Sequence, residues 1–80
     1  MREEKQGAWV AGTRQVLRQI TAGKARRVLI ANDADARIRQ TLAEAADAAR
    51  VPVEPCESMA KLGAMCRIAV PCAAAAEINL

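Results

Sequence analysis

The sequence predicts an α/β protein, a three-layer α/β/α sandwich with a small mixed sheet. Residues 28–31 (VLIA) form a continuous aliphatic run of the kind found in strands that are buried on both faces. Segments with helical periodicity or a high alanine content lie before and after this run. The resulting alternation of strands and helices is typical of βαβ units with right-handed crossovers.

The first helix is predicted to start at Gly12 and Thr13 and to end before Gly23. Gly12 and Thr13 are residue types that occur at helix N-caps, and Gly23 lies where helix C-termini favour glycine. Three apolar residues recur at helical spacing and define the buried side of the helix. They are Val16, Leu17 and Ile20.

The opposite side of this helix is polar and basic. Arg18 lies four residues after Arg14 and three after Gln15, so the three side chains share one face. Two guanidinium groups and an amide near a helix N-terminus suit phosphates and guanine edges. An ordinary solvated face has the same composition, so these residues alone do not assign a function.

Two further helices are predicted from their caps. Asp35 is a candidate N-cap for an alanine-rich helix that ends at Arg50. Ser58 is the candidate N-cap of a third helix, in which Gly63 allows close packing. The inner face of this third helix is predicted to carry Met59, Leu62 and Met65.

The other elements are short. Residues 51–55 are expected to form a second strand whose prolines limit its pairing, and residues 70–80 a last strand. Residues 1–8 are expected to be a short or frayed helical segment, after which Trp9 and Val10 close over the first helix as a hydrophobic staple. The residues expected to be buried together are Val16, Val28, Leu29, Ile30, Leu42, Val53 and Leu62.

The composition narrows the classes of function. Lys and Arg number 12 against 9 Asp and Glu, a net charge of +3, which is a mild indication of an anionic partner. Trp9 is the only aromatic residue, so a folded nucleic acid is a better candidate than single-stranded bases that need stacking platforms. The chain shows neither a signal-peptide pattern nor a membrane-spanning stretch, and we expect a cytoplasmic protein without a membrane partner.

The chain contains little that could support catalysis. It has no histidine, which excludes Ser/His and Cys/His nucleophiles, and no glycine-rich phosphate loop. Cys56, Cys66 and Cys72 form no CxxC pair and are odd in number, so they are expected to be reduced packing residues. We predict that the protein is not an enzyme and holds no cofactor and no metal.

Four short motifs follow one another in an order known from one family. They are residues 12–18 (GTRQVLR), 31–35 (ANDAD), 58–63 (SMAKLG) and 70–73 (VPCA). In this order and spacing the chain resembles the kink-turn-binding ribosomal protein family of the L-seven-Ae and L-thirty-e type, from about Trp9 to Ile78. Its short length, and Arg-Gln where archaeal members have Asn-Glu, make it most similar to the small bacterial YbxF-like members.

The resemblance implies binding to a kink-turn, an RNA duplex bent sharply at a short bulge beside tandem sheared G·A pairs. In the family, the helix start reads the guanines of those pairs and the loop before the last strand covers flipped bulge nucleotides. An acidic residue contacts a flipped base in some members, although for Asp35 a capping role alone is an equal alternative. The RNA-binding residues implied here are Gly12, Thr13, Arg14, Gln15, Arg18, Lys24, Asp35, Ile68, Ala69, Val70, Pro71 and Cys72. Lys24 is a phosphate candidate, as are Arg26, Arg27 and Arg39.

The chain departs from the family pattern at three positions. The family often has Gly at the position of Arg67 and Glu at that of Ala69, and an apolar residue where Glu77 suggests an exposed edge. We expect one monomeric RNA-binding domain over residues 1–80 that recognises kink-turns in ribosomal or other structured RNA, with the ribosome as a candidate partner. Two alternatives stay open: a protein-interaction domain on the same scaffold, and an accessory substrate-binding domain of an RNA-modifying system.

Overall fold

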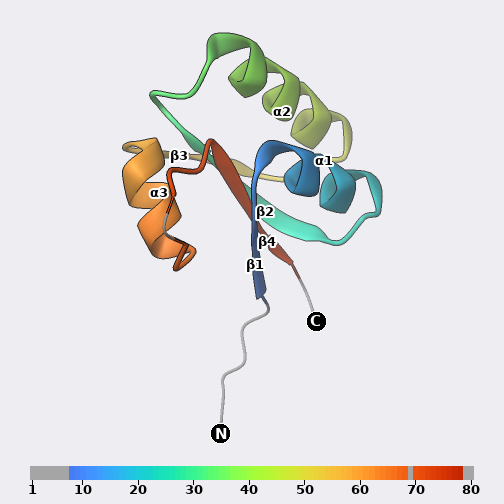
Figure 1. Cartoon of the computed structure of the whole chain (residues 1–80). Helices are drawn as coiled ribbons and strands as arrows, with labels where there is room; N and C mark the ends of the chain where they lie inside the picture. The colour runs from blue at the N-terminus through green and yellow to red at the C-terminus, as the bar shows by residue number, and fades with distance from the viewer. Residues whose placement is uncertain (1–7, 69, 79–80) are drawn as a thin grey trace, which may run out of the picture.

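The computed structural model describes residues 8–68 and 70–78. Within these residues the elements follow one another as β1 (Ala8–Ala11), α1 (Thr13–Thr21), β2 (Ala25–Ala31), α2 (Ala36–Ala48), β3 (Val53–Cys56), α3 (Met59–Met65) and β4 (Ala74–Ile78). Helices α1 and α2 cover one face of the sheet and α3 lies against the other (Figure 1). The predicted three-layer α/β/α architecture is confirmed.

The four strands form one mixed sheet in the order β1-β4-β2-β3. Strand β2 runs parallel to β3 and antiparallel to β4, which in turn runs antiparallel to β1. The ends of β1, β2 and β3 and the start of β4 therefore meet at one end of the sheet, where β2 finishes at Ala31. We call this the Ala31 end, and the opposite end, where β2 starts, the Ala25 end.

Strand β2 supplies side chains to both sides of the sheet, as predicted for a strand buried on both faces. Val28 and Ile30 pack with α1 and α2, whereas Leu29 and Ala31 pack beneath α3. Strand β4 also supplies side chains to both sides of the sheet, and its buried residues are all alanines. Ala74, Ala75 and Ala76 are fully buried. The core is thus two clusters separated by the sheet.

Two residues predicted for the core are exposed. Val53 has 41% of its surface accessible, because β3 is the edge strand and has no neighbour on its outer side. Met65 is 52% exposed, since the next inward position after the buried Leu62 is four residues on, at Cys66. The prediction was wrong for Val53 and Met65.

The N-terminal part of the chain also differs from the prediction. Trp9 and Val10 do not form a hydrophobic staple over α1; they belong to β1, where they lie opposite Glu77 and Ala76 of β4. The strand replaces the staple because β4 offers an otherwise unpaired edge. The remainder of the expected N-terminal segment, residues 1–7, lies outside the described residues.

The last strand is shorter than predicted and starts at Ala74 instead of Val70. Glu77 does not mark an exposed edge, because β4 lies between β1 and β2 and the Glu77 side chain is only 12% accessible. Its carboxylate is compensated by Arg27, which lies directly opposite on β2. A charged residue is therefore accommodated in an interior strand by its cross-strand partner.

The predicted helix boundaries are confirmed where they depend on local chemistry. The Asp35 side chain accepts a hydrogen bond from the Arg37 amide at 2.8 Å at the start of α2. The Ser58 hydroxyl accepts one from the Lys61 amide at 3.1 Å at the start of α3. Gly23 follows the end of α1 with φ 75°, a left-handed conformation that glycine adopts without strain.

Candidate nucleic-acid interface

Backbone hydrogen bonds hold four segments together at the Ala31 end of the sheet. The Gly12 amide donates to the Ala74 carbonyl and the Ala31 amide to the Ala73 carbonyl, both at 2.9 Å. The Asn32 amide donates to the carbonyl at the end of β3, at 2.8 Å. The start of α1, the turn after β2, the end of β3 and the loop before β4 are thereby brought next to one another.

The start of α1 is the electropositive part of this end. Gly12 adopts φ 101°. The first hydrogen bond of the helix runs from the Val16 amide to the Gly12 carbonyl. The amides of residues 13–15 consequently have no acceptor within the helix, and its first turn contains no acidic residue. A helix N-terminus of this kind attracts anions.

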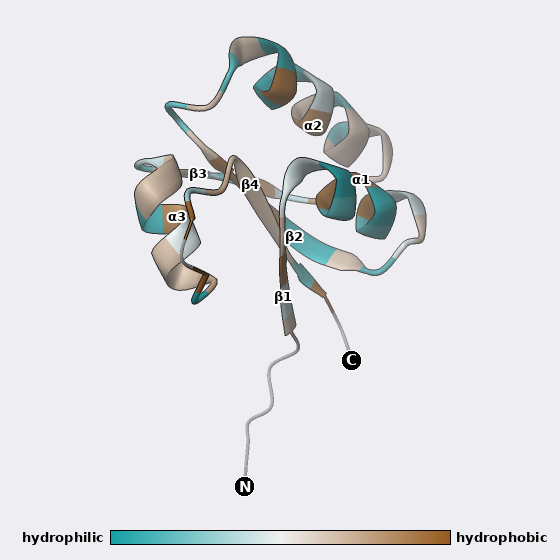
Figure 2. Ribbon diagram, viewed as in Figure 1, coloured by the Kyte–Doolittle hydropathy of each residue, from teal (hydrophilic) through white to brown (hydrophobic). Residues whose placement is uncertain are grey.

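The predicted division of α1 into two faces is confirmed. Val16 and Ile20 are buried against the sheet. Arg14, Gln15 and Arg18 are all exposed. The three polar side chains are thus available to a partner that approaches the Ala31 end, and Figure 2 shows the hydrophilic colour on the outer part of this helix.

The loop between α3 and β4 is the apolar part of the same end. Ile68 is 38% exposed and Val70 is 61% exposed, and Pro71 is exposed as well. Cys72 is different, because it is buried and its thiol donates to the Ala74 carbonyl at 2.7 Å. The side chain of Cys72 is therefore part of the core, and Ala69 lies outside the described residues.

Close packing against α3 determines where this loop lies. A Cβ atom on the buried Gly63 would meet the Val70 carbonyl oxygen at 2.3 Å, so only glycine permits this approach. The predicted close packing at Gly63 is confirmed. Arg67, just after α3, has φ 60°, and this left-handed conformation explains why glycine suits that position.

Two aspartates near the end of β2 cap two different helices. Asp35 caps α2, as described above, so its carboxylate has a structural role irrespective of any RNA contact. The Asp33 carboxylate accepts a hydrogen bond from the amide of Met59, the first residue of α3, at 2.8 Å. This second cap was not anticipated, because nothing local in the sequence identifies a partner 26 residues away.

The basic candidates for phosphate contacts are not all at this end. Lys24 lies between α1 and β2, at the Ala25 end, so the structure does not bring it together with Arg14. Arg39, on the second turn of α2, donates from its Nε to the Ala34 carbonyl at 3.0 Å. Arg26 and Arg27 lie on the first half of β2.

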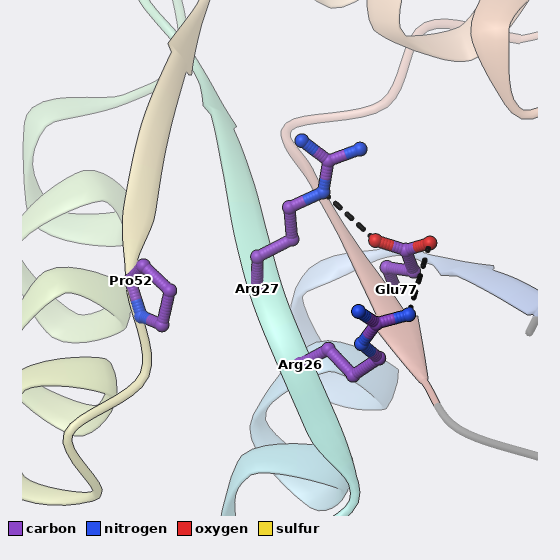
Figure 3. Close-up of a pocket in the computed structure, with 4 residues that line it drawn as sticks. All are labelled: Arg26, Arg27, Pro52 and Glu77. Atoms are coloured by element: carbon purple, nitrogen blue, oxygen red, sulfur yellow. Dashed lines mark hydrogen bonds and ion pairs between the residues drawn. The ribbon is translucent and has the colours of Figure 1, made fainter. Parts of the chain in front are cut away.

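A pocket of about 360 Å³ at the Ala25 end is lined by Arg26, Arg27, Pro52 and Glu77. Figure 3 shows the Nε atom of Arg27 and a terminal nitrogen of Arg26 facing the Glu77 carboxylate. The distances to the carboxylate oxygens are 2.8 Å from Arg27 and 4.0 Å from Arg26. Arg27 also reaches Glu54 at 3.2 Å. With Glu54 included, two guanidinium groups are paired with two carboxylates, which is the arrangement of a structural ion-pair network.

The three cysteines are unpaired thiols packed around the core beneath α3. Burial raises the pKa of the Cys66 thiol, and the neighbouring Cys72 raises it further. Between residues 8 and 78, the described positions contain no cluster of three or more His, Cys, Asp or Glu residues that could hold a metal ion. The same positions include no helix that is both long and apolar enough to span a bilayer.

The fold and this arrangement at the Ala31 end agree with the resemblance noted in the sequence. Over residues 1–80 the chain matches the ribosomal protein L7Ae/L30e/S12e/Gadd45 family, and it belongs to that family. An RNA-binding protein of Geobacillus sp. (strain WCH70) is 47% identical over 73 residues, which cover 91% of this chain and 89% of the relative. RNA-binding protein YbxF of Geobacillus stearothermophilus is 44% identical over 70 residues, which cover 88% of this chain and 85% of the relative.

Solved structures show the same fold. The 15.5 kD RNA binding protein of Giardia lamblia superimposes with a TM-score of 0.85 at 34% identity, covering 91% of this chain and 62% of that one. A protein of unknown function from Bacillus halodurans C superimposes with a TM-score of 0.82 at 17% identity, which shows the fold alone. The predicted family and fold class are confirmed, and so is the broader prediction of an RNA-binding protein of this family and not an enzyme.

Proposed function

We propose that the protein binds kink-turns in structured RNA and stabilises their bent form without any chemical step. The observation that carries this proposal is the proximity of two unlike surfaces at the Ala31 end. One is the basic N-terminal turn of α1, with Arg14 and Gln15 exposed. The other is the apolar loop with Ile68 and Val70 exposed.

The two surfaces suit the two halves of a kink-turn. Guanidinium and amide groups can hydrogen-bond to the guanine edges of sheared G·A pairs, and the α1 N-terminus attracts the phosphates beside them. Bulge nucleotides that leave the stack expose apolar base faces, which aliphatic side chains such as Val70 can cover. A plain duplex offers the phosphates but neither of the other two features.

The compartment, the oligomeric state and the class of ligand are part of the same proposal. In this proposal the protein is a monomer in the cytoplasm, bound to ribosomal or other structured RNA. The net charge of +3 supports the anionic ligand. The curated relatives from Geobacillus sp. (strain WCH70) and Geobacillus stearothermophilus are described as RNA-binding proteins. Their similarity over most of the chain supports an RNA ligand over a protein ligand.

A titration at fixed salt tests the proposal. The protein is titrated with a kink-turn RNA and with a straight duplex of equal length, in which the bulge is removed and the G·A pairs are replaced by Watson–Crick pairs. We expect clear preference for the kink-turn, and loss of that preference in Val70→Asp. This variant places a charge at a position where the side chain is 61% exposed, so we expect the fold to be retained. Equal affinity of the wild type for both RNAs would contradict the proposal and favour the protein-interaction alternative.

A further inference from the structure

We propose that Asp33 is a positioning residue that links the turn after β2 to the loop before β4 and thereby sets the preference for bulged RNA. This inference rests on the proposed function, since it concerns the same Ala31 end. Asp33 would act through hydrogen bonds inside the protein, without contacting RNA. Its role is to hold the apolar loop at a fixed position relative to the N-terminal turn of α1.

The first link is the contact between Asp33 and α3. The Asp33 Oδ1 atom accepts a hydrogen bond from the Met59 amide at 2.8 Å. Met59 is the first residue of α3, so its amide has no acceptor within the helix. Asp33 comes from the turn just beyond β2, and the contact therefore joins two segments of different layers.

The second link continues from the same residue to the loop. The Met59 carbonyl accepts a hydrogen bond from the Cys72 amide at 3.0 Å. The Met59 amide thus donates to the turn between β2 and α2, and the Met59 carbonyl accepts from the loop between α3 and β4. Any displacement of Met59 is passed to the backbone beside Val70 and Pro71.

Packing makes this connection stiff. The Gly63 backbone approaches the Val70 carbonyl so closely that a Cβ atom at Gly63 would lie 2.3 Å from its oxygen. The Ile68 amide donates to the Gly63 carbonyl at 3.1 Å. Because α3 and the loop are in contact at both points, the loop follows α3 when the helix moves.

Capping alone does not explain why Asp33 is placed there. Helix α3 already has an N-cap of its own, since the Ser58 hydroxyl accepts from the Lys61 amide at 3.1 Å. A carboxylate near an anion-binding surface also repels phosphates. What Asp33 adds is a tether between two loops, which the Ser58 cap does not provide because it stays within the sequence of α3.

This difference gives a matched control. Asp33→Ala removes the tether, Asp33→Asn keeps an acceptor oxygen at the same position, and Ser58→Ala removes the local cap of the same helix. For each full-length variant, the affinity for the kink-turn RNA and for the straight duplex is measured at the same salt concentration. Hydrogen exchange of the Cys72 amide is measured on the free protein, with the unfolding midpoint as a check on folding.

We expect Asp33→Ala to lower the ratio of the two affinities about tenfold, the order of magnitude for losing one hydrogen bond to a charged group. Its Cys72 amide should exchange faster than in the wild type. Asp33→Asn should retain most of the ratio. Ser58→Ala should lower the unfolding midpoint but leave both the ratio and the Cys72 exchange close to those of the wild type.

The inference is overturned if Ser58→Ala lowers the ratio as much as Asp33→Ala, because the effect would then be one of α3 stability. It is also overturned if the Cys72 amide is unaffected in Asp33→Ala, whatever the RNA results. Failure of the proposed function looks different, because the wild type itself would then bind both RNAs equally. The two outcomes are therefore separable in one set of measurements.

Discussion

Arg27 and Glu77 lie directly opposite each other on β2 and β4, with the guanidinium Nε 2.8 Å from the carboxylate Oε1. The same guanidinium lies 5.3 Å from the centre of the Trp9 ring and 3.2 Å from the Glu54 carboxylate. One side chain on β2 thus contacts side chains on all three other strands. The hydrogen bond to Glu77 is the main cause of the raised pKa of Arg27, followed on the raising side by that to Glu54.

Glu77→Gln should lower the free energy of unfolding by about 1–2 kcal/mol, because it weakens a hydrogen bond to a charged group that is partly shielded from water. Glu54→Gln is the matched control. The Glu54 side chain is 49% accessible compared with 12% for Glu77, so its loss should cost less than about 0.5 kcal/mol. Urea unfolding of both variants measures the difference, and equal costs would contradict the role given to Glu77.

Gly63→Ala should destabilise the protein by about 1–3 kcal/mol, since the added methyl group meets the Val70 carbonyl and the backbone must shift. It should also displace the backbone amide signal of Val70 in a nuclear magnetic resonance spectrum.

Gly23→Ala provides the comparison for Gly63→Ala. No atom lies within 4 Å of the Cβ position at Gly23, and the cost there is limited to the strain of φ 75°, about 1 kcal/mol. An unchanged Val70 signal in Gly63→Ala would show that the loop does not depend on this contact.

Arg14→Ala should weaken binding to a kink-turn by about 1–3 kcal/mol while changing the affinity for a plain duplex less, because a guanidinium on a guanine edge discriminates between RNAs. Lys24→Ala should weaken binding to both RNAs about equally and reduce the salt slope by about one unit, as for a phosphate contact.

The two variants are compared by titration at several salt concentrations, with circular dichroism as a check on folding. Lys24 lies at the end of the sheet opposite to Arg14, which makes it a suitable test of generic charge. If Arg14→Ala proved indistinguishable from Lys24→Ala, Arg14 would be a phosphate contact only.

The stability of the protein should decrease at alkaline pH because of Cys66. Burial raises the pKa of this thiol in the folded state. At pH values between the ordinary thiol pKa of about 8.5 and the raised one, the folded chain keeps a proton that the unfolded chain has lost. The contribution of the protonated Cys66 thiol to the free energy of unfolding is present in full below about pH 8.5. It is lost as the pH rises through the raised pKa of the thiol.

Urea unfolding from pH 7 to pH 10, with Cys66→Ala as the reference, measures this contribution of Cys66. The free energy of unfolding of the wild type should decline more steeply at alkaline pH than that of the variant. Parallel declines would assign the pH dependence to groups other than Cys66.

Local chemistry explains which parts of the fold were predictable. Asp35, Ser58 and Gly23 mark helix ends through bonds and backbone angles within a few residues, and all three were identified from sequence. The aliphatic run of β2 was identified for a similar reason, since its composition already shows that both faces are buried.

The features that were missed depend on distant partners. Strand β1 exists because Ala8–Ala11 pairs with β4, so its four residues contain no sufficient signal of their own. Glu77 was misassigned to an edge because its partner Arg27 lies 50 positions away. The candidate site shows the same difference. The polar face of α1 was predicted from the spacing of neighbouring residues, whereas the hydrogen bond between Asp33 and Met59 joins residues 26 positions apart and was found only in the structure.

The three buried alanines of β4 have a consequence for protein engineering. Ala75 packs on the α3 side of the sheet, whereas Ala74 and Ala76 pack on the side of α1 and α2. A methylene group added at Ala75 is therefore expected to press on the buried cluster that contains Leu62 and Cys72, and one added at Ala76 on the cluster that contains Val16. Because these three alanines are small, a larger side chain at one of them is expected to shift either the α3 side or the α1 and α2 side of the sheet, without any change to the exposed residues at the Ala31 end.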